Sequence, residues 1–320
     1  MTYRIGVDLG GTNIAAGIVN ENFEIIAQSS VPTGAGRPCV EIVKDIAFVC
    51  KKVIADAGLT EADIVSVGVA SPGTIDDENG IVFRAANLNF FDFPLIPLLR
   101  EMISVKEIHI ENDANAAAWG EAIAGAAKGS DSSVMITLGT GVGGGIIEGG
   151  KIHKGFNNAG AEMGHIVIEV DGRPCTCGRK GCWEAYSSAT GLINMTKEKL
   201  AECEAKGRKT VMTDLVAEKG KVNGRIAFDG LRAGDEAAKE VVDEYIKYLA
   251  SGIASVINIF QPEVLSIGGG ISNEGQYLLD LLVPRVREMQ CAIGVAAQTD
   301  IRIAQLRNNA GIIGAAVLGM

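Results

Sequence analysis

One histidine and three cysteines fall within a single short stretch of the chain. His165, Cys175, Cys177 and Cys182 follow the spacing H-x9-C-x-C-x4-C, and glycine and proline residues between them let the segment fold back tightly. Three thiolates and one imidazole complete the tetrahedral shell of a structural Zn²⁺. Reduced cysteines beside an unrelated histidine are the alternative. The spacing favours a zinc site that orders a loop and does no chemistry itself.

Glycine-rich turns follow three strand-like segments. They read Asp8-Leu9-Gly10-Gly11-Thr12-Asn13, Leu138-Gly139-Thr140-Gly141-Val142-Gly143-Gly144-Gly145 and Ile267-Gly268-Gly269-Gly270-Ile271-Ser272. Glycine lets the backbone approach a ligand and point several N–H groups at anionic oxygens, and Thr12 and Asn13 add side-chain donors. Asp8, at a strand end, is suited to hold Mg²⁺ through water. Neither of the first two turns fits the P-loop pattern, and the first does not fit G-x-G-x-x-G. A plain hairpin explains each turn taken singly, but three in one chain favour a site for nucleotide phosphates.

A carboxylate stands where a strand runs into an alanine-rich helix. The segment reads Ile108-His109-Ile110-Glu111-Asn112-Asp113-Ala114-Asn115-Ala116. Asp113 occupies a position typical of a helix N-cap, a role worth about 1 kcal/mol. The alternative is a general base that accepts a proton from a substrate hydroxyl, with Asn112 holding a neighbouring hydroxyl. This segment alone leaves both roles open.

Short β-branched segments alternate with helical periodicity along the chain. Strands are predicted over 5–8, 16–19, 64–69, 108–110, 134–138 and 264–267, and helices over 40–57, 114–127, 197–203 and 235–260. This alternation indicates an α/β protein with a largely parallel or mixed sheet. Residues 5–19 and 135–147 share a pattern of apolar strand, Gly/Thr turn and second apolar strand. That weak repeat suggests two related half-domains.

Composition narrows the class of protein. The 320 residues carry a net charge of −10, which argues against a nucleic-acid-binding body. The longest uncharged stretch, Ser132 to Ile147, is Gly-rich and shorter than the roughly 20 apolar residues of a membrane span. We expect no signal peptide, because a strand begins within the first residues. Seven cysteines, three of them clustered, suit a reduced cytosol. The sequence therefore predicts a cytoplasmic enzyme.

Together these motifs resemble the ROK family of sugar kinases and regulators, and in particular its bacterial glucokinases. The resemblance covers nearly the whole chain, and its most specific part combines Glu-x-Gly-His at Glu162–His165 with Cys-x-Cys-Gly-x-x-Gly-Cys-x-Glu at Cys175–Glu184. The other matching segments are the first two glycine turns and Asn112–Asp113 with their flanking residues, Ser71-Pro72-Gly73, Ala86-Asn87-Leu88 and Gly268-Gly269-Gly270.

The resemblance implies a two-lobed actin-like, ribonuclease-H-like ATPase fold with ATP and sugar in the cleft between the lobes. Its smaller lobe would comprise residues 1–111 and 309–320, and its larger lobe residues 112–308. Asp113 is implied as the catalytic base. The implied sugar contacts are Gly73, Asn87, Asn112, Asp113, Glu162, His165 and Glu184, with His165 also a zinc ligand. The implied nucleotide-binding residues are Asp8, Gly10, Gly11, Thr12, Asn13, Gly139, Thr140, Gly141, Gly268, Gly269 and Gly270.

The expected activity is ATP-dependent phosphorylation of the 6-hydroxyl of glucose, with Mg²⁺ bound alongside the nucleotide. Mannose, fructose, allose or N-acetylmannosamine as substrate is the nearest alternative, and a non-catalytic sugar sensor is another. An actin-like filament or chaperone ATPase gives no reason for the Cys/His cluster. Because Asp8 lies so near the start, we expect no helix-turn-helix DNA-binding domain ahead of it. By resemblance, the chain should form a homodimer or homotetramer.

Overall fold

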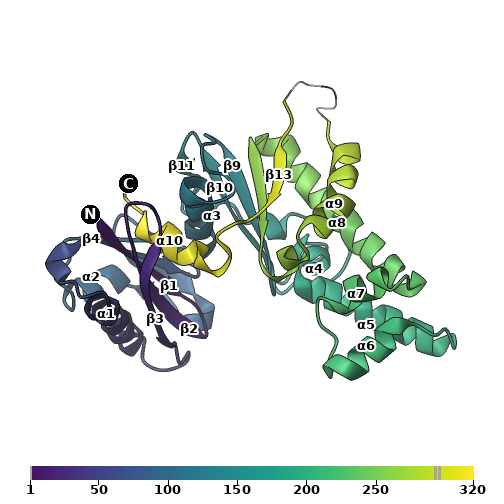
Figure 1. Ribbon diagram of the computed structural model, residues 1–320, viewed down its shortest axis with the longest axis horizontal. Coiled ribbons are helices and arrows are strands. Elements are labelled where there is room, and N and C mark those ends of the chain that lie inside the picture. The colour runs from purple at the N-terminus through teal and green to yellow at the C-terminus, as the bar shows by residue number, and fades with distance from the viewer. Residues whose placement is uncertain (1, 292–293, 295–296) are drawn as a thin grey trace. The chain divides into compact units, whose positions relative to one another are not determined.

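The computed structural model describes residues 2–291, 294 and 297–320, which form an α/β fold (Figure 1). The strands are β1 (Tyr3–Leu9), β2 (Asn13–Val19), β3 (Ile25–Pro32), β4 (Ile64–Ser71), β5 (Thr74–Asp76), β6 (Ile81–Ala85), β7 (Phe90–Phe93), β8 (Glu107–Asn112), β9 (Ser133–Leu138), β10 (Val142–Glu148), β11 (Lys151–Ile152), β12 (Val264–Gly268) and β13 (Asp300–Ile303). The helices are α1 (Cys39–Asp56), α2 (Leu95–Arg100), α3 (Asp113–Ala124), α4 (Glu184–Ser187), α5 (Ala189–Ala205), α6 (Val211–Lys219), α7 (Ile226–Arg232), α8 (Glu236–Phe260), α9 (Gln276–Met289) and α10 (Ala310–Ala316).

Two five-stranded sheets repeat one strand order. The first has the strand order β3-β2-β1-β4-β8 and the second the order β11-β10-β9-β12-β13. If the strands of each sheet are numbered along the chain, both sheets have the order 3-2-1-4-5. In the first sheet β1 and β2 are antiparallel, whereas β4 and β8 continue parallel to β1. The shared order agrees with the weak repeat in the sequence. A third sheet, β5-β6-β7, has three strands.

The six strands predicted from the sequence are confirmed, each lying within a strand of the structure. The predicted helices differ mainly at their ends. The helix predicted over 114–127 is α3, which begins at Asp113 and ends at Ala124, because Gly125 leaves helical geometry with φ −118° and ψ −141°. The helix predicted over 197–203 is the second half of the longer α5.

By its contacts the chain divides into two compact units. Unit 1 comprises residues 1–135, 145–161 and 305–320, and unit 2 comprises 136–144 and 162–304. The lobe boundaries expected from the family resemblance stay a prediction. Among the described residues, no helix has the length and apolar character needed to cross a membrane.

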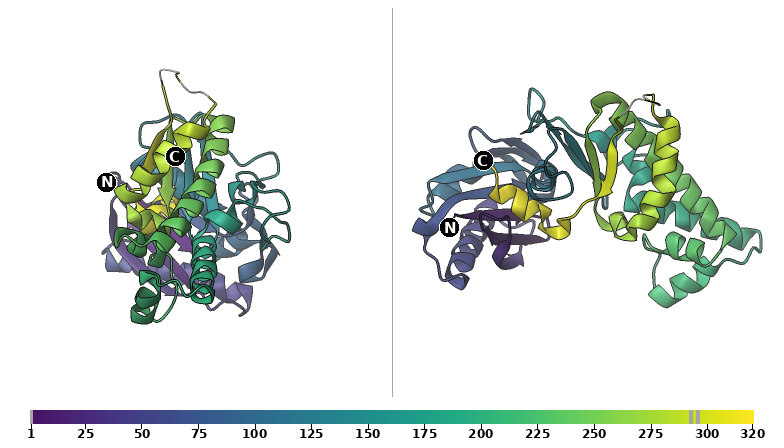
Figure 2. Two further views of the ribbon diagram at one scale, coloured as in Figure 1. Left: turned by 90° about the vertical axis from the view of Figure 1, so that its right-hand side faces the viewer. Right: turned by 45° about the horizontal axis from the view of Figure 1, so that its top comes forward.

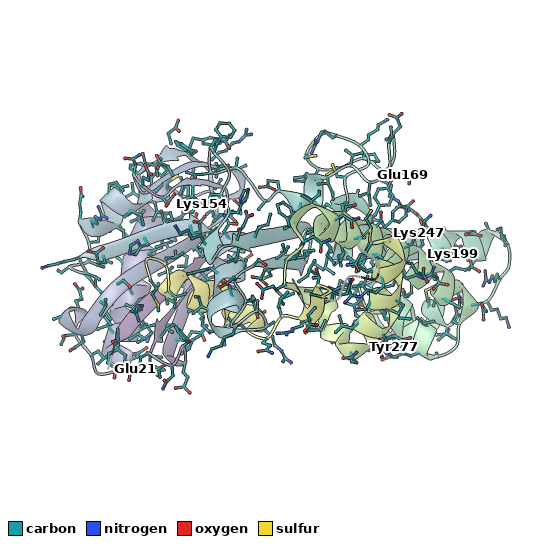
Figure 3. The ribbon with its side chains drawn as sticks, turned by 90° about the horizontal axis from the view of Figure 1, so that it is seen from above. Glu21, Lys154, Glu169, Lys199, Lys247 and Tyr277 are labelled. Carbon is teal, nitrogen blue, oxygen red and sulfur yellow. The ribbon has the colours of Figure 1, made fainter. Side chains whose placement is uncertain are left out.

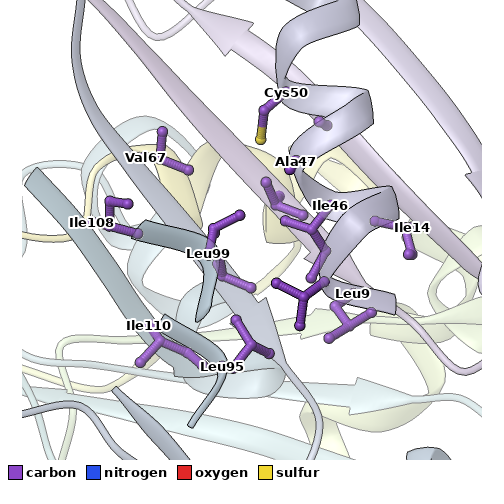
Figure 4. Close-up of a cluster of buried hydrophobic side chains, with 14 of the residues drawn as sticks. Leu9, Ile14, Ile46, Ala47, Cys50, Val67, Leu95, Leu99, Ile108 and Ile110 are labelled. Carbon is purple, nitrogen blue, oxygen red and sulfur yellow. The ribbon is translucent and has the colours of Figure 1, made fainter. Parts of the chain in front are cut away.

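The core of unit 1 lies between its first sheet and the helices α1 and α2 (Figure 4). Ile46 of α1 and Leu95 of α2 are buried against Leu9, Ile14 and Ile108 of the strands. This packing fixes the carboxyl ends of β1 and β8, where the first glycine turn and the Asn112–Asp113 segment begin.

The other face of the first sheet has a row of glycines beneath helix α10. Gly6 pairs in register with Gly17 of β2 and Gly68 of β4. A Cβ on Gly6 would lie 1.8 Å from the carbonyl oxygen of Ile312, and one on Gly68 would lie 1.8 Å from that of Ala315. The absent side chains therefore let the backbone of α10 lie directly on the strands; the right view of Figure 2 shows α10 beside them.

In unit 2 the long helix α8 anchors the segment that leads into α4. Trp183 is fully buried, and its indole N–H donates to the Tyr248 carbonyl oxygen at 3.1 Å. Its ring lies so close to Gly252 that a Cβ there would be 2.0 Å from a ring carbon. Because Trp183 stands between Cys182 and Glu184, this anchor fixes the position of both.

Candidate active site and metal centre

Asn112, and not Asp113, caps helix α3. The Asn112 side-chain oxygen accepts hydrogen bonds from the amides of Ala114 and Asn115 at 2.9 and 3.1 Å. Asp113 is the first residue of the helix, and one of its carboxylate oxygens accepts from the Ala114 amide at 2.8 Å. The reading of Asp113 as an ordinary N-cap is therefore wrong, because the preceding residue fills that role.

Two half-buried carboxylates, those of Asp8 and Asp113, interact in unit 1. Burial raises the pKa of Asp113 above its usual range, although the hydrogen bond from Ala114 opposes this rise. Burial and the charge of Asp113 together raise the pKa of Asp8 to about 6. The start of α10 also packs here, since a Cβ on Gly311 would lie 3.0 Å from the Asp8 carboxyl group. A pair of carboxylates with disfavoured charges fits a place where a cation and a proton-donating substrate bind.

The first glycine turn is closed by its own hydrogen bonds. The Gly10 amide donates to the Asn13 carbonyl oxygen at 2.9 Å, and the buried hydroxyl of Thr33 donates to the Gly10 carbonyl oxygen at 2.6 Å. Asn87 lies beside the turn, because a Cβ on Gly11 would be 3.3 Å from its amide nitrogen. The turn is thus ordered, with a predicted sugar contact next to its second glycine.

Gly73 and Asn112 are joined directly. The Asn112 side-chain amide donates to the Gly73 carbonyl oxygen at 3.0 Å. Gly73 has φ +99°, and a Cβ on it would lie 2.0 Å from the Arg84 carbonyl oxygen, so no larger residue fits without rearrangement. In unit 1 the structure therefore gathers Asp8, the first glycine turn, Asn87, Gly73, Asn112 and Asp113 around neighbouring strand ends.

In unit 2 the second glycine turn is tied to Glu184. One carboxylate oxygen of Glu184 accepts from the Val142 amide at 3.1 Å, and the other accepts from the Thr176 hydroxyl at 3.2 Å. The Thr190 hydroxyl donates to the Thr140 carbonyl oxygen at 2.7 Å. A cavity of about 470 Å³ is bordered by this turn, Glu184 and the amino-terminal part of α5, a volume within the range of small-molecule sites.

The third glycine junction meets the second turn. Gly268 ends β12, Gly269 has φ +83°, and a Cβ on Gly269 would lie 2.5 Å from the Leu138 carbonyl oxygen. Gly270 begins a short 3₁₀ helix, in which the Asn273 side chain donates to the Gly270 carbonyl oxygen at 3.0 Å. Two of the three predicted glycine segments thus lie against each other in unit 2.

The Cys/His cluster has the dimensions of a metal shell. Ligand atoms of His165, Cys175, Cys177 and Cys182 all lie within 4.8 Å of one another. His165 Nδ1 is 3.7 Å from the Cys175 sulfur, and the Cys177 and Cys182 sulfurs are 3.6 Å apart. Tetrahedral Zn²⁺ with bonds of about 2.0–2.3 Å places its ligands roughly 3.4–3.8 Å from one another. The four residues therefore fit a structural zinc ion.

Two thiols of the cluster differ in pKa. Hydrogen bonds from the amide and guanidinium of Arg179 lower the pKa of Cys177 to about 6, whereas burial raises that of Cys182 to about 12. A coordinated divalent cation would hold both as thiolates. The Cys175 thiol lies 3.6 Å from Glu184, so the cluster supports the same carboxylate that contacts the second glycine turn. Glu162 directly precedes the short 3₁₀ helix that carries His165, and its carbonyl oxygen accepts from the His165 amide at 3.0 Å.

Comparison with known proteins agrees with this arrangement of motifs. The family model described as "ROK family" matches residues 4–320. The chain belongs to the ROK family. The glucokinase of Thermotoga maritima is 37% identical to this ROK protein over 98% of the chain and 95% of its own length. The glucokinase of Halalkalibacterium halodurans is 36% identical over 98% of the chain and 93% of its own length.

Solved structures of ROK proteins have the same fold. A crystal structure of a ROK family glucokinase from Streptomyces griseus, in complex with glucose and AMPPNP, matches with a TM-score of 0.80 and 33% identity, over 99% of this chain and 98% of that one. A ROK hexokinase from Thermus thermophilus matches with a TM-score of 0.79 and 30% identity, over 99% and 97% of the two chains. These matches confirm the expected actin-like α/β fold class.

Several contacts at the site were not predicted from the sequence. Thr33 and Gly311 reach the first glycine turn and Asp8 from distant parts of the chain, and Lys154 contacts Glu111 beside Asn112. A single threonine, glycine or lysine far from a motif gives no recognisable signal. Only their positions in the folded chain reveal them.

Proposed function

We propose that this ROK protein is an ATP-dependent hexose kinase that phosphorylates the 6-hydroxyl of glucose. The observation that supports this most is that Asp113 is a half-buried carboxylate whose pKa is raised by burial, while Asn112 caps the helix. Such a carboxylate accepts a proton at neutral pH more readily than an exposed aspartate. The glucokinases of Thermotoga maritima and Halalkalibacterium halodurans, similar along nearly the whole chain, support glucose as the acceptor.

In the proposed reaction, Asp113 accepts the proton of the 6-hydroxyl as its oxygen attacks the γ-phosphorus of ATP and ADP leaves. Backbone amides of the first and second glycine turns offset charge on the phosphoryl oxygens, and the third junction contacts the adenosine side. Mg²⁺, when bound near Asp8, neutralises charge on the nucleotide phosphates. In this proposal, residues 1–111 and 309–320 form the smaller lobe, and residues 112–308 form the larger lobe.

The sugar is held by hydrogen bonds in this proposal. Glu162, Glu184 and Asn112 fix the ring with Asn87 and the backbone at Gly73, and His165 uses the ring nitrogen that does not face Cys175. Bonds of this kind discriminate well, because a wrong sugar leaves buried polar groups unpaired. Zn²⁺ on the four-residue cluster would order Glu184 without taking part in the reaction. We further propose that the protein acts in the cytoplasm as a homodimer or homotetramer.

A coupled assay tests the function directly. ADP release should require both ATP and a sugar, and glucose should give the highest kcat/KM among glucose, mannose, fructose, allose and N-acetylmannosamine at equal concentration. Oxidation of the product by glucose-6-phosphate dehydrogenase should match ADP release mole for mole. If another sugar gives a higher kcat/KM than glucose, that sugar is the preferred substrate and the assignment of glucose is wrong. Sugar binding without ADP release would favour the sensor, and ATP hydrolysis without sugar would reject the kinase.

A further inference from the structure

A buried carboxylate lies directly before the segment that holds the proposed base. Glu111 is the penultimate residue of β8 and is 3% exposed. One of its oxygens accepts from the Asn112 amide at 2.9 Å and from the Asn115 side-chain amide at 3.1 Å. Glu111 therefore contacts the residue before Asp113 and another in the first turn of α3. A buried carboxylate of this kind also needs a positive partner.

Lys154 supplies that partner from another part of unit 1. Its ammonium lies 2.9 Å from the second oxygen of Glu111 and 2.7 Å from a carboxylate oxygen of Asp77 (Figure 3 labels Lys154). Burial alone would lower the pKa of Lys154, but its hydrogen bonds to Asp77 and Glu111 raise that pKa overall. The lysine is therefore charged at neutral pH and bridges two carboxylates.

The bridge joins the two segments that carry predicted sugar contacts. Asp77 follows β5, which begins directly after Gly73, and Glu111 immediately precedes Asn112. Asn112 in turn donates to the Gly73 carbonyl oxygen. Lys154 thus closes a ring of contacts from Asp77 through Glu111 and Asn112 to Gly73. All of these contacts are between groups of the protein, so Lys154 can hold the ring together without contacting a substrate.

We propose that Lys154 is a positioning residue of this kinase, which acts through Glu111 to hold Asn112 and Asp113 in the geometry needed for proton transfer. The proposal rests on the function proposed above. Without the ammonium, Glu111 becomes a buried charge with no positive partner, and its side chain turns away from this position. Its hydrogen bonds to Asn112 and Asn115 then weaken, and Asp113 loses its fixed position. A small displacement of a catalytic group is enough to slow turnover strongly.

Four variants test the route through Glu111. Lys154→Met keeps the unbranched chain as far as Cε but removes the ammonium group. It should lower kcat for the sugar at least tenfold, with KM for ATP changed less than twofold. Lys154→Arg should retain kcat within about threefold of wild type. The double variant Lys154→Met with Glu111→Gln should also recover to within threefold, because glutamine accepts the same two hydrogen bonds without a buried charge. Lys151→Met, at an exposed lysine of β11 three residues before Lys154, is the matched control and should leave kcat unchanged.

A second readout needs no reaction. Amide hydrogen exchange over residues 107–118 should accelerate at least tenfold in Lys154→Met and stay at the wild-type rate in Lys154→Arg and in the double variant. This measurement separates the role of Lys154 from the proposed kinase activity. Wild-type protein that releases no ADP with any sugar would reject the kinase, whereas hydrogen exchange tests the effect of Lys154 on residues 107–118 without any reaction.

The proposal is overturned if Lys154→Met keeps kcat within threefold of wild type or leaves the exchange rate unchanged. It is also overturned if the double variant stays more than tenfold below wild type, since Lys154 would then act independently of Glu111. Should Lys154→Met alone not fold, the double variant, which has no unpaired buried charge, decides by the same threshold.

Discussion

Asp8, at the end of β1, has a pKa raised by its burial and by repulsion from the carboxylate of Asp113, at the start of α3. Register explains the proximity, because Asp8 pairs with Ala70 of β4 and Ala70 pairs with Glu111 of β8, two residues before Asp113. The two groups therefore come from strands that end side by side in unit 1. When both carboxylates are ionised, the folded state is destabilised unless a bound ligand compensates their charge.

The raised pKa of Asp8 predicts that the stability of the protein depends on pH. Folding raises the pKa of Asp8 from 3.8 to about 6, so the folded protein binds a proton at Asp8 more tightly than the unfolded chain. The resulting contribution to stability is complete below pH 3.8 and is lost as the pH rises through 6. Asp8→Asn has no titrating group at this position. Its free energy of unfolding, relative to that of the wild type, should therefore increase from pH 4 to pH 7 and then level off. A shift of about two units corresponds to at most about 3 kcal/mol.

Urea unfolding of ligand-free protein at several pH values measures the effect. Asp56→Asn, at an exposed ion pair on α1, is the control and should show less than about 1 kcal/mol of change. A stability difference between Asp8→Asn and wild type that does not depend on pH would contradict the assigned pKa.

The Cys/His cluster predicts a structural metal. Purified protein should hold about one zinc per chain, and Cys177→Ser should lose the metal and melt at a lower temperature, because the bound ion stabilises only the folded loop. Elemental analysis and a thermal melt measure both properties. Cys291→Ser, at an exposed cysteine outside the cluster, should change neither. Zinc-free wild-type protein with full activity and an unchanged melting temperature would remove this part of the account.

The contact between α10 and the first sheet predicts a severe effect of one methyl group. Gly68→Ala places a carbon 1.8 Å from the Ala315 carbonyl oxygen, and backbone on both sides must move, so we expect a loss of about 3 kcal/mol. Gly224→Ala, whose new carbon meets only the terminal methyl of Ile271 at 3.1 Å, is the control. Denaturant unfolding should separate the two variants, and equal stabilities would contradict the close packing of α10.

Local patterns predicted the strands and the clustering of His165 with three cysteines, because each depends on residues near one another in sequence. The β-branched segment ending at Asp8 predicts a strand by itself, and the spacing from Cys175 to Cys182 limits how far those thiols can separate. The same reasoning predicted that Asn112 and Asp113 stand at a helix start, but not which of them caps it. That choice depends on the backbone conformation of Asn112, which has φ −59° and ψ 143°.

Long-range partners could not be predicted in this way. The glycine row needs the register of three strands and the path of a helix more than 240 residues beyond Gly68. The contact between Lys154 and Glu111 joins a short hairpin to a strand end, and the sequence around Lys154 differs little from any exposed basic turn. Both features follow from how separate segments pack and not from any local pattern.

The most direct measurement for the central claim is glucose-dependent ADP release by Asp113→Asn. Asparagine keeps the shape of the side chain and accepts the Ala114 hydrogen bond, but it cannot take the hydroxyl proton. We predict that kcat falls by about 10²- to 10⁴-fold, while the melting temperature stays equal or rises because repulsion with Asp8 is removed. A folded variant whose kcat falls less than tenfold would contradict the assignment of Asp113 as the general base.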